Sequence, residues 1–119
     1  MDYSIDHDPI GPAHLVCAQG ELDLAAAPQL STLLAMGVAS SQTSVGLDLT
    51  EVLFIDSTAL GVVLRASEQL NEVNKPLLIV VPEGPVKRLL ALTNLTQHFT
   101  VYATRQQAVA AAEGVSAAY

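Results

Sequence analysis

Basic residues are scarce in this chain of 119 residues, which has five Lys and Arg against twelve Asp and Glu. The formal net charge at pH 7 is therefore −7, and no run of Lys or Arg forms a local basic patch. Because nucleic-acid phosphates and anionic membrane surfaces repel such a protein, the composition argues against both as partners. A protein partner with a basic surface is electrostatically favoured instead.

Disulfides and long apolar runs are also missing. Cys17 is the single cysteine, so no intramolecular disulfide can form, and its apolar neighbours predict a small buried residue. Unbroken apolar runs such as Leu77–Val81 are far shorter than the roughly 20 residues needed to cross a bilayer. The N-terminus has no basic segment before an apolar one, so we predict no signal peptide and a cytoplasmic location.

Residues of common catalytic and cofactor sites are equally sparse. His7, His14 and His98 are dispersed, without Cys or carboxylate at metal-ligand spacing, so no metal site is expected. Glu83-Gly84-Pro85 lacks the glycine pattern of phosphate or dinucleotide loops, so no cofactor is expected. Ser57 lacks the glycine that precedes the serine of a nucleophile elbow by two residues. We therefore predict that the chain is not an enzyme.

The apolar pattern predicts strands and helices that alternate in the order ββαβαβαβα. Half of the residues are hydrophobic, and Leu, Val, Ile and Ala must build the core because Trp is absent. Short apolar or alternating runs predict five strands, at 3–8, 14–20, 45–50, 77–81 and 99–102, with a turn at Pro9, Gly11 and Pro12. Helical periodicity predicts four helices, which begin near Pro28, Ser57, Pro85 and Thr104.

This order predicts an α/β fold. Three βαβ crossovers imply a mixed, mostly parallel sheet of about five strands with about four helices, and the first two strands form an antiparallel hairpin at its edge. Residues 1–113 are expected to form a single domain, and residues 114–119 a loose C-terminal tail. The run 77–81 is expected to be a strand buried on both faces.

Asp48 lies in the predicted strand 45–50, where a phosphorylatable aspartate of the response-regulator kind has to be considered. Those domains need a Lys after a later strand, and Pro82-Glu83 stands there instead. We expect Asp48 to point outward into solvent, between the inward residues Leu47 and Leu49. After Thr50 we expect an apolar loop over 52–55.

The junction Asp56-Ser57-Thr58, where the loop meets a helix, is the most informative part of the chain. A Ser or Asp here is an expected N-cap, because its side-chain oxygen accepts an unpaired N–H of the first turn. A hydroxyl here also protrudes at the carboxyl end of a strand, where α/β proteins place their sites. A phosphate on it would face the helix N–H groups and the positive end of the helix dipole. A plain helix cap and a phosphate acceptor both remain open at this point.

Other features of the surface near this junction suit a docking role. Asp23, after the second strand, would reinforce the negative field of Asp56. On the helix, Val62 and Ala66 are expected to point away from the core stripe, which consists of Leu60, Val63, Leu64 and Leu70. A small apolar strip beside a polar helix start is a plausible partner footprint, although scattered surface apolar residues are also normal.

The segment Phe54-Ile55-Asp56-Ser57-Thr58-Ala59-Leu60-Gly61 resembles the signature of STAS domains, in which an apolar loop leads to Asp-Ser, a small residue and Leu-Gly. Gly20-Glu21-Leu22-Asp23 is similar to the Gly-Glu-Leu-Asp turn of the same family, and the order of elements agrees over essentially the whole chain. The resemblance implies a STAS-like fold of the anti-sigma factor antagonist type. Ala59 departs from the pattern, because Gly is common at that position, and its methyl group could alter how closely a partner approaches.

The resemblance further implies a phosphoprotein that regulates transcription by partner switching. Ser57 would accept phosphate from an anti-sigma factor that is also a serine kinase, with Thr58 as a second candidate. The unphosphorylated form would bind that partner and free the sigma factor, and a phosphatase would reset the phosphorylated form. The expected partner-binding residues are Asp23, Asp56, Ser57, Thr58, Ala59, Val62, Arg65 and Ala66.

Two other functions remain open from the sequence. One is a STAS domain that does not switch and serves as a scaffold or accessory subunit of a transporter or sensory complex. The other is an enzyme or small-ligand sensor that uses the same part of the surface, which the small number of polar groups disfavours.

Overall fold

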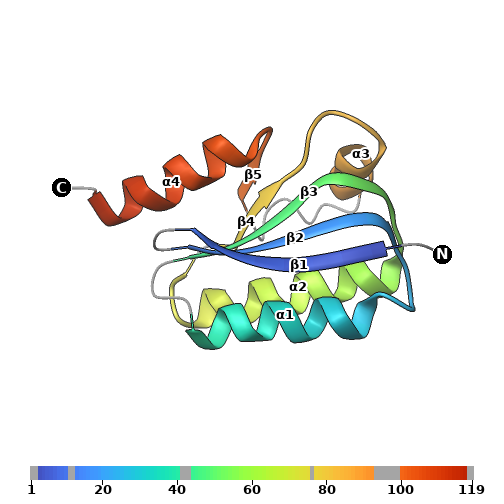
Figure 1. Cartoon of the computed structure of the whole chain (residues 1–119), viewed down its shortest axis with the longest axis horizontal. Coiled ribbons are helices and arrows are strands. Elements are labelled where there is room, and N and C mark those ends of the chain that lie inside the picture. Colours follow the sequence, from blue (N-terminus) through green and yellow to red (C-terminus); the bar gives the residue numbers. More distant parts are fainter. Residues whose placement is uncertain (1–2, 11–12, 41–43, 76, 93–99, 118–119) are drawn as a thin grey trace.

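A computed structural model describes residues 3–10, 13–40, 44–75, 77–92 and 100–117. The elements occur in the predicted order ββαβαβαβα, which is therefore confirmed (Figure 1). They are β1 (Tyr3–Ile10), β2 (Ala13–Leu22), α1 (Ala27–Ser40), β3 (Ser44–Ile55), α2 (Ser57–Glu72), β4 (Leu77–Val80), α3 (Pro85–Leu92), β5 (Thr100–Tyr102) and α4 (Arg105–Ala117).

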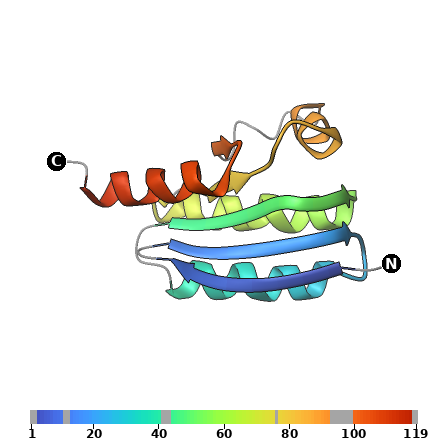
Figure 2. The same cartoon turned by 45° about the horizontal axis from the view of Figure 1, so that its top comes forward.

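The strands form one five-stranded sheet in the sequential order β1-β2-β3-β4-β5. β1 pairs antiparallel with β2, and the other neighbours pair in parallel, so the predicted mixed sheet with an antiparallel edge is confirmed. Helices α1 and α2 cover one face of the sheet, and α4 lies on the other face (Figures 1 and 2). Each parallel connection needs a crossover, so α1 and α2 both start at the edge where β2 and β3 end.

The main core lies between the sheet and the helices α1 and α2. Aliphatic side chains fill it, as the composition predicts, and the inward residues of β3 are 0 to 1% exposed at Val45, Leu47 and Leu49. β4 is buried at all four of its positions, which confirms the expectation of a strand covered on both faces. A smaller apolar cluster joins this strand to α4 and contains Leu78, Val80 and Ala108.

β3 continues to Ile55, so the predicted end at Thr50 and the expected loop over 52–55 are wrong. The sequence pattern did not show this continuation because β3 has one more residue than β2 at each of two irregularities in the pairing. The first lies between the pairs Cys17↔Asp48 and Gln19↔Glu51, and the second between the pairs Gly20↔Val52 and Glu21↔Phe54. Each extra residue shifts the faces of the side chains beyond it, which breaks the period-two pattern of a strand. Gly20, at the second irregularity, has a φ of +86°, a conformation that glycine adopts without steric cost.

The ends of other elements also differ from expectation. Pro9 lies inside β1 rather than in a turn, and β2 runs past Gly20 to Leu22. α4 extends to Ala117 along its alanine-rich sequence, so residues 114–117 of the predicted tail are helical. Gly11, Pro12 and Phe99, which were assigned to a turn and to the last strand, lie outside the described residues.

The side chain of Arg105 links the start of α4 to the sheet through hydrogen bonds. Its Nε donates to Asp48 Oδ2 at 3.0 Å, and its Nη2 donates to Cys17 Sγ at 2.9 Å. The backbone N–H of Thr50 donates to the other carboxylate oxygen of Asp48 at 2.9 Å. The expectation of a solvated Asp48 is therefore wrong, because this residue is 7% exposed. Cys17 is half-buried beside a guanidinium group rather than enclosed by apolar side chains.

Candidate functional site

The carboxyl ends of β2 and β3 meet at one edge of the sheet, where Leu22 pairs with Ile55. The next residues, Asp23 and Asp56, therefore lie at the same edge. Figure 1 shows that α1 and α2 both start at this edge. The backbone N–H of Asp56 donates to the carbonyl oxygen of Leu22 at 3.0 Å and joins the two strand exits. The structure thus brings together the two segments that the sequence singled out.

Asp56 is the N-cap of α2. Its backbone is extended (φ −97°, ψ 178°), and its Oδ1 accepts a hydrogen bond from the N–H of Ala59 at 2.9 Å. Ser57 is therefore the first residue of the helix rather than its cap. The capping hydrogen bond is made by the side chain of Asp56 and not by the hydroxyl of Ser57. The side chains of Ser57 and Thr58 are both exposed.

Asp23 holds the turn that leads into α1. Its Oδ1 accepts the N–H groups of Ala25 and Ala26 at 3.0 and 3.3 Å. The carboxylates of Asp23 and Asp56 are both half-buried and accept from uncharged backbone donors. Neither of these contacts brings a positive charge to the carboxylates, and the exposed Ser57 directly follows Asp56 in the chain.

A third carboxylate, that of Glu83, follows β4 and forms an ion pair with Lys87. Lys87 Nζ donates to Glu83 Oε1 at 2.6 Å. This hydrogen bond and the charge of Lys87 lower the pKa of Glu83 below its ordinary value. Because the ammonium offsets the carboxylate, this pair adds little net charge to its end of the sheet.

Three of the predicted partner-binding residues are buried. Ala59, Val62 and Ala66 are 0, 8 and 5% exposed, so the expectation that Val62 and Ala66 form an exposed strip is wrong. The reason is that α2 packs against α1 as well as against the sheet, and Val62 and Ala66 line a small hollow between the helices with Leu34 and Ala35. These side chains therefore lie between the two helices and not on an exposed surface of α2.

The outer face of α2 begins at Ser57 and continues at Gly61, Leu64 and Arg65, which follow it by four, seven and eight residues. Ser57 and Arg65 are exposed, whereas Gly61 and Leu64 are half-buried. Leu64 was expected in the core stripe and lies at its margin. The sequence reasoning counted Gly61 as part of the STAS signature but did not include it among the partner-binding residues, although a glycine weakens a helix.

Exposed apolar side chains also gather near this edge. Leu24, Leu53 and Phe54 are 70, 75 and 46% exposed, and they lie within three residues of Asp23 or Asp56. The sequence reasoning assigned them no separate role, because it placed 53 and 54 in a loop. Apolar groups of this size beside an exposed hydroxyl are typical of a surface that binds another protein.

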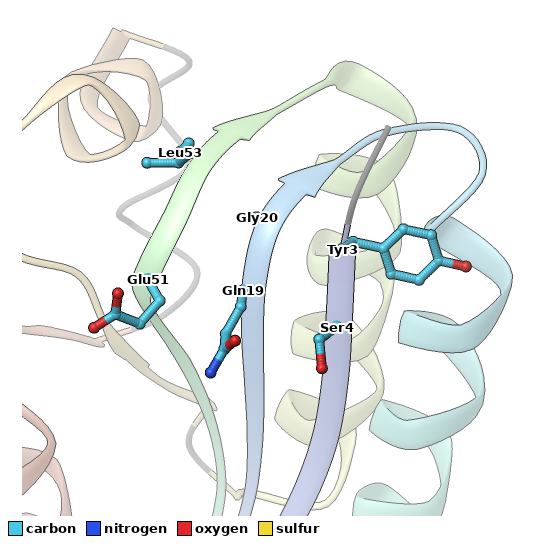
Figure 3. A pocket seen from close by; sticks show the side chains of 6 residues that line it. All are labelled: Tyr3, Ser4, Gln19, Gly20, Glu51 and Leu53. Atoms are coloured by element: carbon cyan, nitrogen blue, oxygen red, sulfur yellow. The ribbon is translucent and has the colours of Figure 1, made fainter.

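On the face of the sheet opposite α1 and α2, the part that α4 leaves uncovered has a hollow of about 380 Å³, lined by Tyr3, Ser4, Gln19, Gly20, Glu51 and Leu53. Figure 3 shows Ser4, Gln19 and Glu51 on three neighbouring strands, where the register places them opposite one another. The Tyr3 ring turns away from the hollow, and its hydroxyl donates to the carbonyl oxygen of Ala25 at 3.3 Å. With one carboxylate, Glu51, in its lining, the hollow offers neither an acid–base pair nor a set of metal ligands.

Of the three histidines, His14 is the one whose side chain the structure describes, and it lies near the start of β2, away from this edge. His14 is 7% exposed and packs against α1, whereas the side chain of His7 and the whole of His98 lie outside the described residues. Within the described ranges, no group of three or more His, Cys, Asp or Glu could hold a metal ion. No helix among the described residues has the length and apolar character to cross a membrane.

Asp56→Ala is expected to lower the free energy of unfolding by about 1 kcal/mol, the usual cost of removing a side chain that caps a helix. Thr58→Ala is the matched control, because Thr58 is exposed in the same turn; we expect a change within about 0.5 kcal/mol. Urea denaturation of both variants measures the difference. Equal stability of the two variants would show that the Asp56–Ala59 hydrogen bond does not support α2.

Comparison with known proteins agrees with this geometry. The family model described as STAS domain matches residues 7–108. BtrV of Bordetella bronchiseptica, which is named an anti-sigma factor antagonist, is 32% identical over 104 residues, which cover 87% of this chain and 90% of BtrV. The crystal structure of an anti-sigma factor antagonist from Mycobacterium paratuberculosis superposes with a TM-score of 0.85 at 25% identity, over 94% of this chain and 95% of that chain.

More distant structures share the fold alone. The Bacillus cell fate determinant SpoIIAA in its phosphorylated form has a TM-score of 0.71 at 18% identity, over 89% of this chain and 96% of its own. A sulfate transporter family protein from Wolinella succinogenes has a TM-score of 0.78 at 16% identity, over 89% of this chain and 88% of its own. Because proteins with such different names have this fold, the function has to be argued from the residues around Ser57.

Proposed function

This chain belongs to the STAS domain family, and from that premise we propose that it is an anti-sigma factor antagonist that is switched by phosphorylation of Ser57. The unphosphorylated chain binds an anti-sigma factor with serine kinase activity and so frees a sigma factor for transcription. Phosphorylation of Ser57 releases that partner, and a phosphatase restores the binding form. The observation that carries this proposal is the exposed hydroxyl of Ser57 at the first position of α2, beside an Asp56 that performs the capping.

Accessibility supports Ser57 as the acceptor. A hydroxyl must be reached by the γ-phosphate of a nucleotide held by another protein, with the reacting atoms about 3–3.5 Å apart. Ser57 is exposed at the edge of the domain, whereas Ser67 of the same helix is fully buried. Thr58 is also exposed and remains the second candidate, one position further into the helix.

The fold can carry a phosphate at this position. A phosphate on Ser57 would lie at the N-terminus of a 16-residue helix, where backbone N–H groups and the helix dipole favour negative charge. SpoIIAA, which shares the fold, exists in a phosphorylated form. The expected effect of phosphorylation on the stability of the domain is therefore small.

The interface with the partner is where the phosphate acts. The group adds a charge of roughly −1.5 to −2 next to the half-buried carboxylates of Asp23 and Asp56. A partner that docks on this edge has to desolvate all three groups, which is costly unless each finds a compensating donor. Release on phosphorylation follows from this cost without any change in fold.

Phosphorylation by the cognate partner tests the proposal. The chain is incubated with its anti-sigma factor and Mg-ATP, and the modified residue is mapped by fragmentation of the peptides. We expect one phosphate on Ser57, none in Ser57→Ala, and an unchanged yield in Ser4→Ala, which removes an exposed hydroxyl on the uncovered face of the sheet. Phosphate on a residue other than Ser57 or Thr58 would contradict the proposal.

A further inference from the structure

Gly61 lies inside α2, yet the packing of the domain does not require a glycine there. Apart from its two chain neighbours and the nearby backbone of α2 itself, a Cβ atom added to Gly61 would meet no atom of the described residues within 4 Å. Gly37 of α1 is different, because a Cβ there would lie 2.6 Å from Cδ2 of the buried His14. Positive φ angles among the described glycines occur at Gly20 and Gly84, so the backbone of Gly61 is one that any residue could adopt. The fold therefore explains Gly37 and leaves Gly61 unexplained.

A glycine within a helix has a cost. It loses more backbone freedom on folding than any other residue and leaves the helix backbone open to water, so it is the poorest helix former after proline. At Gly61 this cost in helix stability is not offset by closer packing against other parts of the domain. A contact outside the domain is the remaining physical reason for the missing side chain.

The position of Gly61 indicates which contact this is. Gly61 follows Ser57 by four residues and lies about 6 Å further along the helix axis, on the same outer face. Leu64 and Arg65 follow in the next turn. The missing side chain therefore leaves a notch in the surface between the Ser57 hydroxyl and Leu64, which we call the Gly61 notch.

We propose that the Gly61 notch receives a segment of the anti-sigma factor kinase that approaches the backbone of α2 closely while the kinase holds Ser57. This inference rests on the proposed function and adds the position of the partner on the helix. A kinase that brings its reacting groups to about 3–3.5 Å from the Ser57 hydroxyl must also cover the surface one helical turn away. The half-buried Leu64 at the far side of the notch offers an apolar contact to the same segment.

Variants that fill the notch test this inference. Gly61→Ala and Gly61→Gln are compared with Ala39→Gln, which adds a side chain at an exposed position near the C-terminal end of α1. We expect Gly61→Ala to raise the thermal midpoint by about 2–5 °C, because alanine is the better helix former. Gly61→Gln is expected to weaken binding of the partner more than tenfold by calorimetry and to slow phosphorylation of Ser57, whereas Ala39→Gln changes neither.

The outcomes separate this inference from the proposed function. Gly61→Gln could bind and be phosphorylated like the wild type while Ser57→Asp loses binding. This result would contradict the proposed contact at the Gly61 notch and would support the proposed switch at Ser57. A lower thermal midpoint of Gly61→Ala would also contradict the proposed contact, because the fold would then need the glycine. If Ser57→Asp binds as tightly as Ser57→Ala, the switch fails, and a tenfold loss in Gly61→Gln would still place the partner on α2.

Discussion

Ser57→Asp is expected to weaken binding to the anti-sigma factor about 100-fold and to leave the stability of the domain unchanged or slightly higher. An aspartate at the first position of α2 places its charge at the positive end of the helix dipole, which stabilises a helix by about 0.3–1 kcal/mol. The loss of binding arises at the interface, where like charges brought together cost several kcal/mol. The new carboxylate joins those of Asp23 and Asp56, and a 100-fold loss corresponds to about 2.7 kcal/mol.

Calorimetric titration of the partner with three variants checks this result. Ser57→Ala retains a neutral side chain and should bind like the wild type. Ser4→Asp adds the same charge to an exposed serine on the uncovered face of the sheet, so its affinity should also be unchanged. Equal affinity of Ser57→Asp and Ser57→Ala would contradict the switch. That outcome would favour a STAS domain that serves as a scaffold or accessory subunit.

Arg105→Ala is expected to lower the free energy of unfolding by about 2 kcal/mol. The side chain of its partner Asp48 is 10% exposed, so removal of the guanidinium leaves a carboxylate that water hardly reaches. Breaking a fully buried ion pair from one side costs about 3–5 kcal/mol. Because the Arg105 side chain is 43% exposed, water can enter in its place, and we expect the smaller figure.

Lys87→Ala is the matched control for this prediction. It removes the cation of an ion pair of similar length, but the Glu83 side chain is 87% exposed and stays in water when its partner is lost. We expect no measurable change in the free energy of unfolding, because exposed ion pairs contribute little to stability. The double variant Arg105→Ala/Asp48→Ala should recover part of the loss, because it leaves no unpaired carboxylate. Urea denaturation that gives equal values for Arg105→Ala and Lys87→Ala would show that the Asp48–Arg105 contact does not hold α4.

The order of the elements was predictable because each has a local signal. Alternation marked the first half of β3, an unbroken apolar run marked β4, and Pro85 marked the start of α3. The meeting of Asp23 with Asp56 followed from the same reasoning, since the carboxyl ends of neighbouring parallel strands share an edge. These inferences need only the period of the apolar residues and the rules of chain connection.

The features that the sequence did not reveal depend on contacts between distant segments. Asp48 is buried because Arg105 reaches it, and 57 positions separate the two residues. The bulges in β3 depend on its register against β2, which is set by pairing rather than by the local pattern. Val62 and Ala66 were misplaced because one apolar stripe on a helix shows a single buried face, whereas α2 is covered by both the sheet and α1.

The sequential order of the strands has a consequence for how the protein is made. Each strand pairs with the one that precedes it in the chain, so the sheet can grow at one edge while the ribosome releases residues in order. The elements that position Asp23, Asp56 and Ser57 are β2, α1, β3 and α2, and they are complete at Glu72. Of the later strands, β4 then pairs with the free edge of β3, and β5 pairs with β4. The surface proposed to receive the phosphate therefore belongs to the half of the chain that can assemble first.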